Sequence, residues 1–158
     1  MSDPSNQQIM EKVRGTNAMN AENFLPENYR PAEDEPFMNE RQLEYCRRKL
    51  IAWRHDLLED SRDTIEGLQD STRNIPDVTD RASEETDRAL ELRTRDRQRK
   101  LVTKIDAALR RIDNGEFGYC EVTGEPISLK RLDARPIATM TLEAQERHER
   151  REKVHRDD

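Results

Sequence analysis

Residues 39–57 read NERQLEYCRRKLIAWRHDL and contain a helix start followed by an apolar stripe. Asn39 is a favourable N-cap residue, and Gln42 stands at the third helical position, which together form a pattern like a capping box. The sequence therefore predicts a helix that begins at about Glu40. Its apolar side chains recur at alternating spacings of three and four residues, which places them on one narrow face: Leu43, Cys46, Leu50, Trp53 and Leu57.

The heptad spacing of this apolar stripe is interrupted after Leu57. Asp60 occupies the next position that a strict heptad repeat would make apolar. Ile65 and Leu68 continue the stripe shifted by one residue, which is the pattern of a stutter in a coiled coil. We expect the helix to run to about residue 70 with a local change in supercoil.

A second long helix is predicted after a turn. Pro76 interrupts the helical pattern, so the chain should turn between Thr72 and Thr79. The second helix should end at Asn114, which with the glycine after it is a stop signal. Two long helices joined by a short turn pair most simply as an antiparallel hairpin. The apolar face predicted for the second helix comprises Ala82, Ala89, Leu101, Ile105, Ala108 or Leu109, and Ile112.

The flanking segments complete a mainly α fold. Four prolines among polar residues predict a partly extended N-terminal arm over residues 1–38. The coiled-coil hairpin should cover residues 39–113, with its tip at about 72–80. A small turn-rich module and a C-terminal helix should fill residues 114–158, and Thr141 is placed to cap that last helix as it runs toward Val154.

The composition narrows the class of protein. Charged residues make up 39% of the chain and hydrophobic residues 32%, which is enough for a helical seam but too little for a thick two-layer core. A net charge of −6 argues against sequence-independent DNA binding and favours a protein partner. Cys46 and Cys120 are the only cysteines and lie far apart, as in a protein of the reducing cytoplasm. The chain shows neither a membrane-length apolar run nor a constellation typical of an enzyme.

Residues 117–136, FGYCEVTGEPISLKRLDARP, resemble the C-terminal module of the DksA/TraR family of RNA polymerase-binding transcription factors. The likeness extends over roughly residues 33–150, with MNERQLEYCRRKLIAWRHDL similar to the first arm helix of that family and NIPDVTDRASEETDRALELRTRDRQRKL similar to its tip and second helix. In that family the module is a zinc finger with two Cys-x-x-Cys pairs. The four ligand positions in this chain are Cys120, Thr123, Thr141 and Ala144.

A zinc finger of this type needs four thiolate or similar donors, and three of the four positions lack one. We therefore expect a degenerate finger without zinc or any other metal. Cys120 should then be either a relic of the finger or a small core residue. Packing should hold the module together through residues such as Phe117, Tyr119, Ile127, Leu132 and Ile137.

The resemblance also implies a role for the hairpin tip. The family pattern Asp-x-x-Asp-Arg-Ala is present as Asp77, Asp80, Arg81 and Ala82. Taken alone, such carboxylates are explained by helix capping and by the helix dipole. The resemblance implies that the tip enters the secondary channel of RNA polymerase, where the acidic pair is needed for regulating initiation.

A second implied site binds the alarmone ppGpp together with polymerase in the stringent response. Its positions in this chain are Arg97, Leu101, Lys104 and Arg135, while Gln145 stands where the family has a further lysine. Arginine and lysine suit phosphates through charge-assisted hydrogen bonds. From the residues alone, the basic stretch 93–100 is either a solvated helix face with ion pairs to the first helix or an anion-binding or polymerase-docking surface.

Two other functions stay open from the sequence. A carboxylate pair on a long rod suits a Gre-like transcript-cleavage factor that coordinates magnesium, and an apolar seam suits a structural coiled-coil adaptor that dimerises. The favoured prediction is a monomeric, cytoplasmic transcription regulator that binds RNA polymerase directly. It should use ppGpp as an effector, bind no DNA sequence-specifically, contact no membrane and catalyse no reaction.

Overall fold

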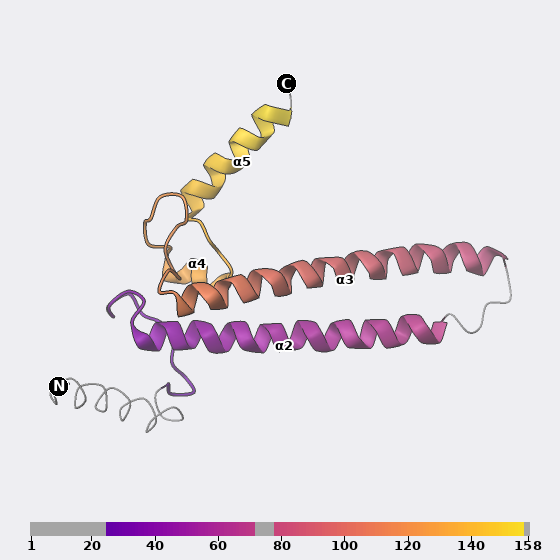
Figure 1. The fold of residues 1–158 in the computed structure, drawn as a ribbon, viewed down its shortest axis with the longest axis horizontal. Coiled ribbons are helices and arrows are strands. Elements are labelled where there is room, and N and C mark those ends of the chain that lie inside the picture. The colour runs from indigo at the N-terminus through magenta and orange to yellow at the C-terminus, as the bar shows by residue number, and fades with distance from the viewer. Residues whose placement is uncertain (1–24, 72–77, 157–158) are drawn as a thin grey trace, which may run out of the picture. The chain divides into compact units, whose positions relative to one another are not determined.

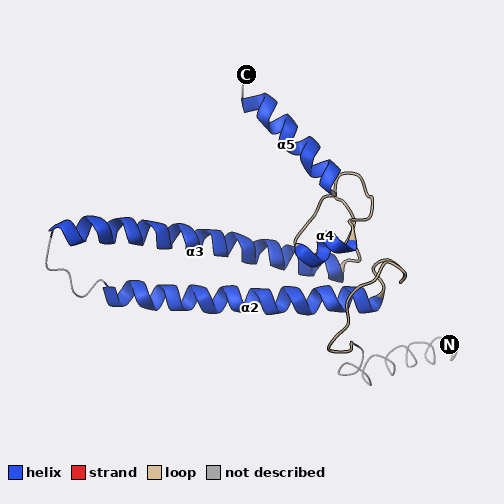
Figure 2. Cartoon of the chain, turned by 180° about the vertical axis from the view of Figure 1, so that it is seen from behind, coloured by secondary structure: helices blue, strands red, loops and turns tan. Residues whose placement is uncertain are grey.

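The computed structural model describes residues 25–71 and 78–156 of the chain. In these ranges the chain forms the helices α2 (Glu40–Ser71), α3 (Val78–Asp113), α4 (Leu129–Ala134) and α5 (Leu142–Arg156) (Figure 1). The one β-type pairing within them is an isolated bridge between Tyr119 and Pro126, and the rest is loop (Figure 2). The mainly α fold predicted from the sequence is confirmed.

The two long helices form the predicted antiparallel hairpin. They lie side by side and run in opposite directions in both views (Figures 1 and 2). α2 has 32 residues and begins at Glu40, as predicted, while α3 has 36 residues and ends just before Asn114. The predicted turn falls largely on residues 72–77, which lie outside the described residues.

The seam between the helices is formed by the residues nearest the module. Leu50 of α2 and Ile105 of α3 are fully buried, and each such side chain contributes about 1.5–3 kcal/mol relative to exposure. The other buried seam residues are Cys46, Leu57, Ala108 and Ile112. The other leucines and the tryptophan predicted for the two apolar faces are half-buried: Leu43, Trp53, Leu101 and Leu109.

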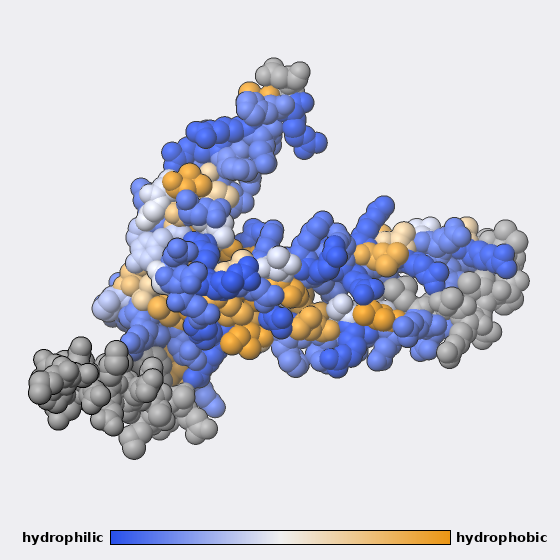
Figure 3. Space-filling view, viewed as in Figure 1, coloured by the Kyte–Doolittle hydropathy of each residue, from blue (hydrophilic) through white to orange (hydrophobic). Residues whose placement is uncertain are grey.

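Beyond Leu57 none of the α2 side chains that the structure describes is buried: Ile65 of the predicted shifted stripe is half-buried, and the Leu68 side chain is outside the description. The predicted face of the second helix differs more. Ala82 and Ala89, expected to start the apolar face of the second helix, are exposed. Alanine side chains are too short to bridge two helices, and the residues between them are mostly charged. On the face shown in Figure 3, apolar surface accordingly gathers over the end of the hairpin beside the module.

Ion pairs supplement the seam. Arg47 pairs with Asp113 at 2.6 Å and Arg54 with Asp106 at 2.8 Å, which joins α2 to α3. Lys49 contacts Asp133 of α4 at 2.7 Å. Because all these side chains are at least a third exposed, each pair contributes only about 0–1 kcal/mol.

A side-chain cap begins each of the two helices α4 and α5. The Thr141 hydroxyl oxygen accepts a hydrogen bond from the Ala144 N–H at 3.3 Å, so the predicted cap of the last helix is confirmed. α4 was not predicted. Its N-cap Ser128 accepts a hydrogen bond from the Arg131 N–H at 3.3 Å, and a serine ahead of a short Leu-containing run was the signal available in the sequence.

The chain divides into two compact units, residues 1–45 and 46–158, and the hairpin seam, α4 and α5 belong to the second unit. In the first unit, residues 26–39 form successive turns, with backbone hydrogen bonds from Tyr29 to Pro26 and from Glu35 to Ala32. The rings of Tyr29 and Tyr45 pack edge to face, and their centroids are 6.0 Å apart. Residues 1–24 of the predicted arm lie outside the described residues. None of the helices described has the length and apolar character needed to cross a membrane.

Candidate functional site

The hairpin tip is described only on its α3 side. Asp80 lies in the first turn of α3, where a carboxylate interacts favourably with the positive end of the helix dipole. Asp80, Arg81 and Ala82 are all exposed. Asp77, the other half of the predicted acidic pair, lies outside the described residues.

The predicted ppGpp residues of α3 share one helix face. Arg97, Leu101 and Lys104 are spaced by four and three residues, so their side chains emerge on the same side. Arg97 and Lys104 are exposed, and Leu101 between them is half-buried. This face can present two cations on either side of an apolar contact.

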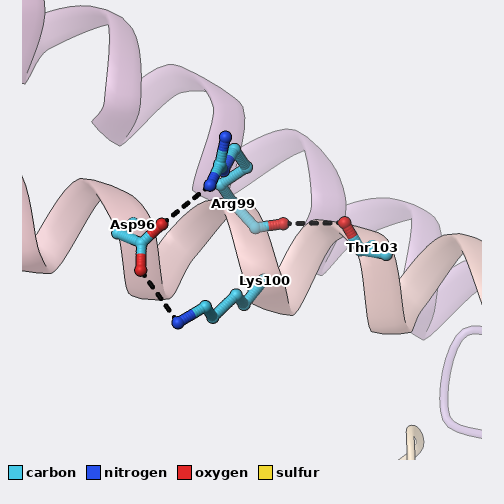
Figure 4. Close-up of polar contacts among 4 residues, drawn as sticks. All are labelled: Asp96, Arg99, Lys100 and Thr103. Carbon is cyan, nitrogen blue, oxygen red and sulfur yellow. Dashed lines mark hydrogen bonds and ion pairs between the residues drawn. The ribbon is translucent and has the colours of Figure 1, made fainter.

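The rest of the basic stretch is partly neutralised within α3 itself. Asp96 accepts hydrogen bonds from both Lys100 and Arg99 at 2.9 Å (Figure 4). These contacts, with Lys100 the stronger cause, hold the pKa of Asp96 below its usual range. The prediction of a solvated face is supported, but these two ion pairs run within α3 and not to the first helix.

The fourth predicted ppGpp residue comes from another element. Arg135 is exposed and ends α4, with its N–H donating to the Arg131 carbonyl at 2.8 Å. Gln145, where the family has a lysine, accepts a hydrogen bond from the Arg131 guanidinium and donates one to Glu149 at 2.9 Å. Arg131 also donates to the Met140 carbonyl at 3.0 Å. A cation is therefore already present beside position 145.

Three of the four degenerate zinc-ligand positions are buried in the module. Cys120, Thr141 and Ala144 are buried, with 2%, 8% and 4% of their surface exposed. Thr123 is exposed, and its hydroxyl donates a hydrogen bond to the Glu125 carboxylate at 3.4 Å. The sequence correctly predicted that Cys120 is a core residue, and Phe117, Ile127, Leu132 and Ile137 are buried around the module as expected. Tyr119 is 38% exposed, so its prediction as a core residue was wrong.

The pKa values of the two cysteine thiols are shifted in opposite directions. Burial raises the pKa of the Cys46 thiol to about 11. Burial also acts to raise the pKa of Cys120, but hydrogen bonds from the Thr123 hydroxyl and from the N–H groups of Thr141, Thr123 and Val122 outweigh it and bring the pKa to about 7. Both cysteines are thus buried core residues, and only the Cys120 thiol has a lowered pKa.

These residues do not fit a structural zinc ion. Hydroxyl and methyl groups at positions 123, 141 and 144 cannot replace thiolates in a tetrahedral site. Elsewhere in residues 25–71 and 78–156, no three His, Cys, Asp or Glu side chains are grouped so as to hold a metal.

One feature of the hairpin was not predicted as a site. A cavity of about 380 Å³ opens between α2 and α3, lined in part by Leu57, Leu58, Leu92 and Val102. Gln98 also lines it, and the side-chain oxygen of this residue is buried without a hydrogen-bond partner among the residues that the structure describes. The cavity begins at Leu57, where the heptad pattern falters, and that irregularity was the available signal.

The comparisons with known proteins agree with this architecture. Residues 42–112 match the family described as DnaK suppressor protein DksA, N-terminal domain, and residues 115–150 match the prokaryotic dksA/traR C4-type zinc finger. The RNA polymerase-binding transcription factor DksA of Caulobacter vibrioides (strain NA1000 / CB15N) is 69% identical over 131 residues, which cover 83% of this chain and 92% of that protein. The protein of the same name from Escherichia coli (strain K12) is 43% identical over 127 residues, covering 80% and 84%.

A solved structure shares the fold. The transcription factor DksA2 from Pseudomonas aeruginosa matches with a TM-score of 0.69 and 41% identity, over 74% of this chain and 90% of that one. The sequence identity over most of the chain and the shared hairpin fold therefore indicate the same family. This chain belongs to the DksA/TraR family of RNA polymerase-binding transcription factors, and it is a regulator and not an enzyme.

Proposed function

We propose that the protein inserts the α2–α3 hairpin into the secondary channel of RNA polymerase and there modulates transcription initiation together with ppGpp. The observation that carries this proposal is the exposure of α3. From Asp80 to Arg95 every residue except Glu84 is exposed, including Leu90 at 54% and Leu92 at 50%. A long helical arm that is packed so little within its own chain suits insertion into a larger partner.

The tip is proposed to act and the flanks of the arm to dock. Asp77 and Asp80 would meet the polymerase near its catalytic centre and alter initiation without hydrolysing a substrate, with Ala82 at the tip beside them.

The test separates binding from regulation. The double variant Asp77→Asn with Asp80→Asn should keep its affinity for RNA polymerase and lose promoter regulation, because asparagine also caps helices and leaves the arm intact. A matched control replaces two exposed carboxylates farther along α3, Asp87→Asn with Glu91→Gln, and should regulate normally. Loss of affinity in proportion to loss of regulation would show that the acidic pair docks and does not act.

The ppGpp site is proposed at Arg97, Leu101, Lys104 and Arg135. The shared face of the first three residues supports this assignment, since it offers two exposed cations around an apolar contact. A phosphate enclosed between two proteins gains about 1.5–3 kcal/mol from each charge-assisted hydrogen bond, against about 0–1 kcal/mol for an exposed ion pair. The alarmone should therefore bind the complex with polymerase and not the free protein.

We further propose that the protein is a cytoplasmic monomer that contacts promoters only through polymerase. Membership in the DksA/TraR family disfavours both the Gre-like transcript-cleavage factor and the structural adaptor. Backtracked elongation complexes should show no added transcript cleavage when the protein is present. A mass measurement in solution should give one chain of 18.6 kDa.

A further inference from the structure

The cavity between α2 and α3 lies on one side of the hairpin. Four of the residues that line it on α3 are spaced by three, four and three positions and so share one helix face: Leu92, Arg95, Arg99 and Val102. Arg97 is two positions away from both arginines of this set and therefore points to another side of α3. The cavity is thus separate from the helix face proposed for ppGpp.

The cavity wall is largely apolar and reaches the surface. Leu58 of α2 and Leu92 of α3 line it and are 42% and 50% exposed, while Leu57, which also lines it, is buried. Apolar side chains around an unfilled space lack the contacts that a close-packed core would give them, and this lowers the stability of the fold. Exposed apolar side chains that gather in this way mark a surface that another molecule covers.

Two polar groups of the cavity wall lack a partner among the described residues. The side-chain oxygen of Gln98 is buried and accepts no hydrogen bond there, which is rare for a buried acceptor in a folded protein. Arg95 is exposed and forms neither a hydrogen bond nor an ion pair with a described residue. Arg99, in contrast, pairs with Asp96 at 2.9 Å (Figure 4). The cavity therefore offers an apolar wall together with an unused acceptor and an unpaired positive charge.

We propose that this cavity is a docking groove for an acidic amphipathic helix of RNA polymerase. The inference rests on the proposed function for the identity of the partner, but neither on the acidic tip nor on ppGpp. An apolar side chain of the partner helix fills the space between Leu58 and Leu92, and a polar one donates a hydrogen bond to the Gln98 oxygen. A carboxylate pairs with Arg95. Because Leu92 and Arg95 are one helical turn apart, the apolar and acidic side chains of the partner are also one turn apart.

The form and the charge of the groove favour a helix over a small molecule. Its volume of about 380 Å³ would admit a small ligand, but the residues that line it all come from two neighbouring helices. Such a groove cannot enclose a ligand on all sides, whereas pockets for small molecules bury about 70–90% of the ligand surface. Amphipathic helices bind in grooves of this kind through apolar anchors. The lining has two arginines against Asp96, which also pairs with Lys100, so an acidic partner is complementary in charge.

The affinity for core RNA polymerase, measured without ppGpp, tests the apolar wall. Leu92→Ala should weaken binding by about tenfold or more, because it removes one side of the groove. Leu90→Ala is the matched control, since Leu90 is similarly exposed at 54% but does not line the cavity, and it should leave the affinity nearly unchanged. Equal losses would overturn this inference and leave the proposed function standing. A wild-type protein that fails to bind polymerase would overturn both.

The charge of the partner is tested at Arg95. Arg95→Glu should weaken binding by about tenfold at low salt and by less at high salt, because salt screens the ionic contact. Arg93→Glu makes the same change at an exposed arginine that does not line the cavity. If both variants lose the same affinity, only the net charge of the protein matters, and the assignment of an acidic helix to this groove is overturned.

Filling the cavity from within separates docking from folding. Gln98→Leu places an apolar side chain in the space and removes the unused acceptor, so it should stabilise the free protein and weaken polymerase binding by about tenfold. A cavity without a role in binding would give higher stability with unchanged affinity, and that result would overturn the proposal.

Discussion

Asn39 and Gln42 cap the start of α2 in opposite directions. The Asn39 side-chain oxygen accepts a hydrogen bond from the Gln42 N–H at 2.9 Å, while the Gln42 side-chain oxygen accepts one from the Met38 N–H at 2.8 Å. The Gln42 amide nitrogen donates to the Ala32 carbonyl at 3.2 Å and to Glu35 at 3.3 Å. The residue is fully buried, so its amide connects the preceding turns to the helix and does not merely cap it.

Replacing this glutamine should loosen the turns before α2. Gln42→Leu keeps a similar volume but leaves the Met38 N–H and the Ala32 carbonyl without their partner, which should lower the local free energy of unfolding by about 1–3 kcal/mol. Hydrogen exchange of residues 38–45 measures this. Gln69→Leu, which changes an exposed glutamine of the same helix, is the control and should have almost no effect. A similar effect of both variants would contradict the role assigned to Gln42.

The same turns should be sensitive to acid. The pKa of Glu35 lies below its usual range, chiefly because the Tyr29 hydroxyl donates a hydrogen bond to it at 2.5 Å. Because the folded-state pKa is below the unfolded value, the stabilisation is present above the unfolded pKa and is lost as the pH falls through the folded pKa. We expect residues 26–39 to loosen below about pH 4. In an NMR titration, Tyr29→Phe should raise the pKa of the Glu35 carboxyl, and an unchanged titration would refute the effect of this hydrogen bond.

Filling the cavity between α2 and α3 should stabilise the hairpin. Gln98→Leu removes a buried oxygen without a partner among the described residues and adds apolar contact beside Leu57, so it should raise the free energy of unfolding by about 1 kcal/mol. Denaturant unfolding, followed by the fluorescence of Trp53, measures the change. The Gln69→Leu variant again controls for added hydrophobicity. A loss of stability would mean that the Gln98 oxygen is hydrogen-bonded to water in solution.

The binding of ppGpp should depend on Lys104 only when RNA polymerase is present. Lys104→Ala should weaken labelled ppGpp binding to the complex by about tenfold or more, which corresponds to roughly 1.4 kcal/mol. Arg135→Ala should act in the same direction, and Gln145→Lys in the opposite one. Lys130→Ala, a change of another exposed lysine, is the control. The RNA polymerase used in the assay must have no ppGpp site of its own. Equal ppGpp binding by all the variants would show that this basic face is only a solvated surface.

The predictions that succeeded depend on neighbouring residues. Asn39 and Thr141 mark the starts of α2 and α5 because a cap acts within one helical turn, and Leu50 and Ile105 are buried because helical periodicity assigns them to the seam. The fold class and both long helices could therefore be derived from the sequence. Residues 72–77, with Asp77 among them, lie outside the described residues, so the structure does not test the acidic pair.

The features that were missed depend on how separate segments approach one another. Ala82 fits the apolar periodicity, but whether a methyl group is buried depends on the distance to the facing helix. The Glu121 N–H donates to the Thr139 carbonyl at 2.9 Å and so joins two loops of the module, and sequence spacing gives no measure of that approach. The cavity beside Gln98 is likewise lined by residues of both α2 and α3, and the sequence pattern of one helix gives no measure of how the other faces it.

The exposure of α3 from Asp80 to Arg95 also has an evolutionary consequence. Surface substitutions usually change stability by no more than about 0.5 kcal/mol, so this part of the helix can vary with little cost to the folding of the protein. Selection on it must then come almost wholly from whatever it touches in another molecule. The buried seam around Leu50 and Ile105 is under the opposite constraint. Related chains should therefore diverge along the arm at a rate set by their binding partners, independently of the residues that keep the hairpin folded.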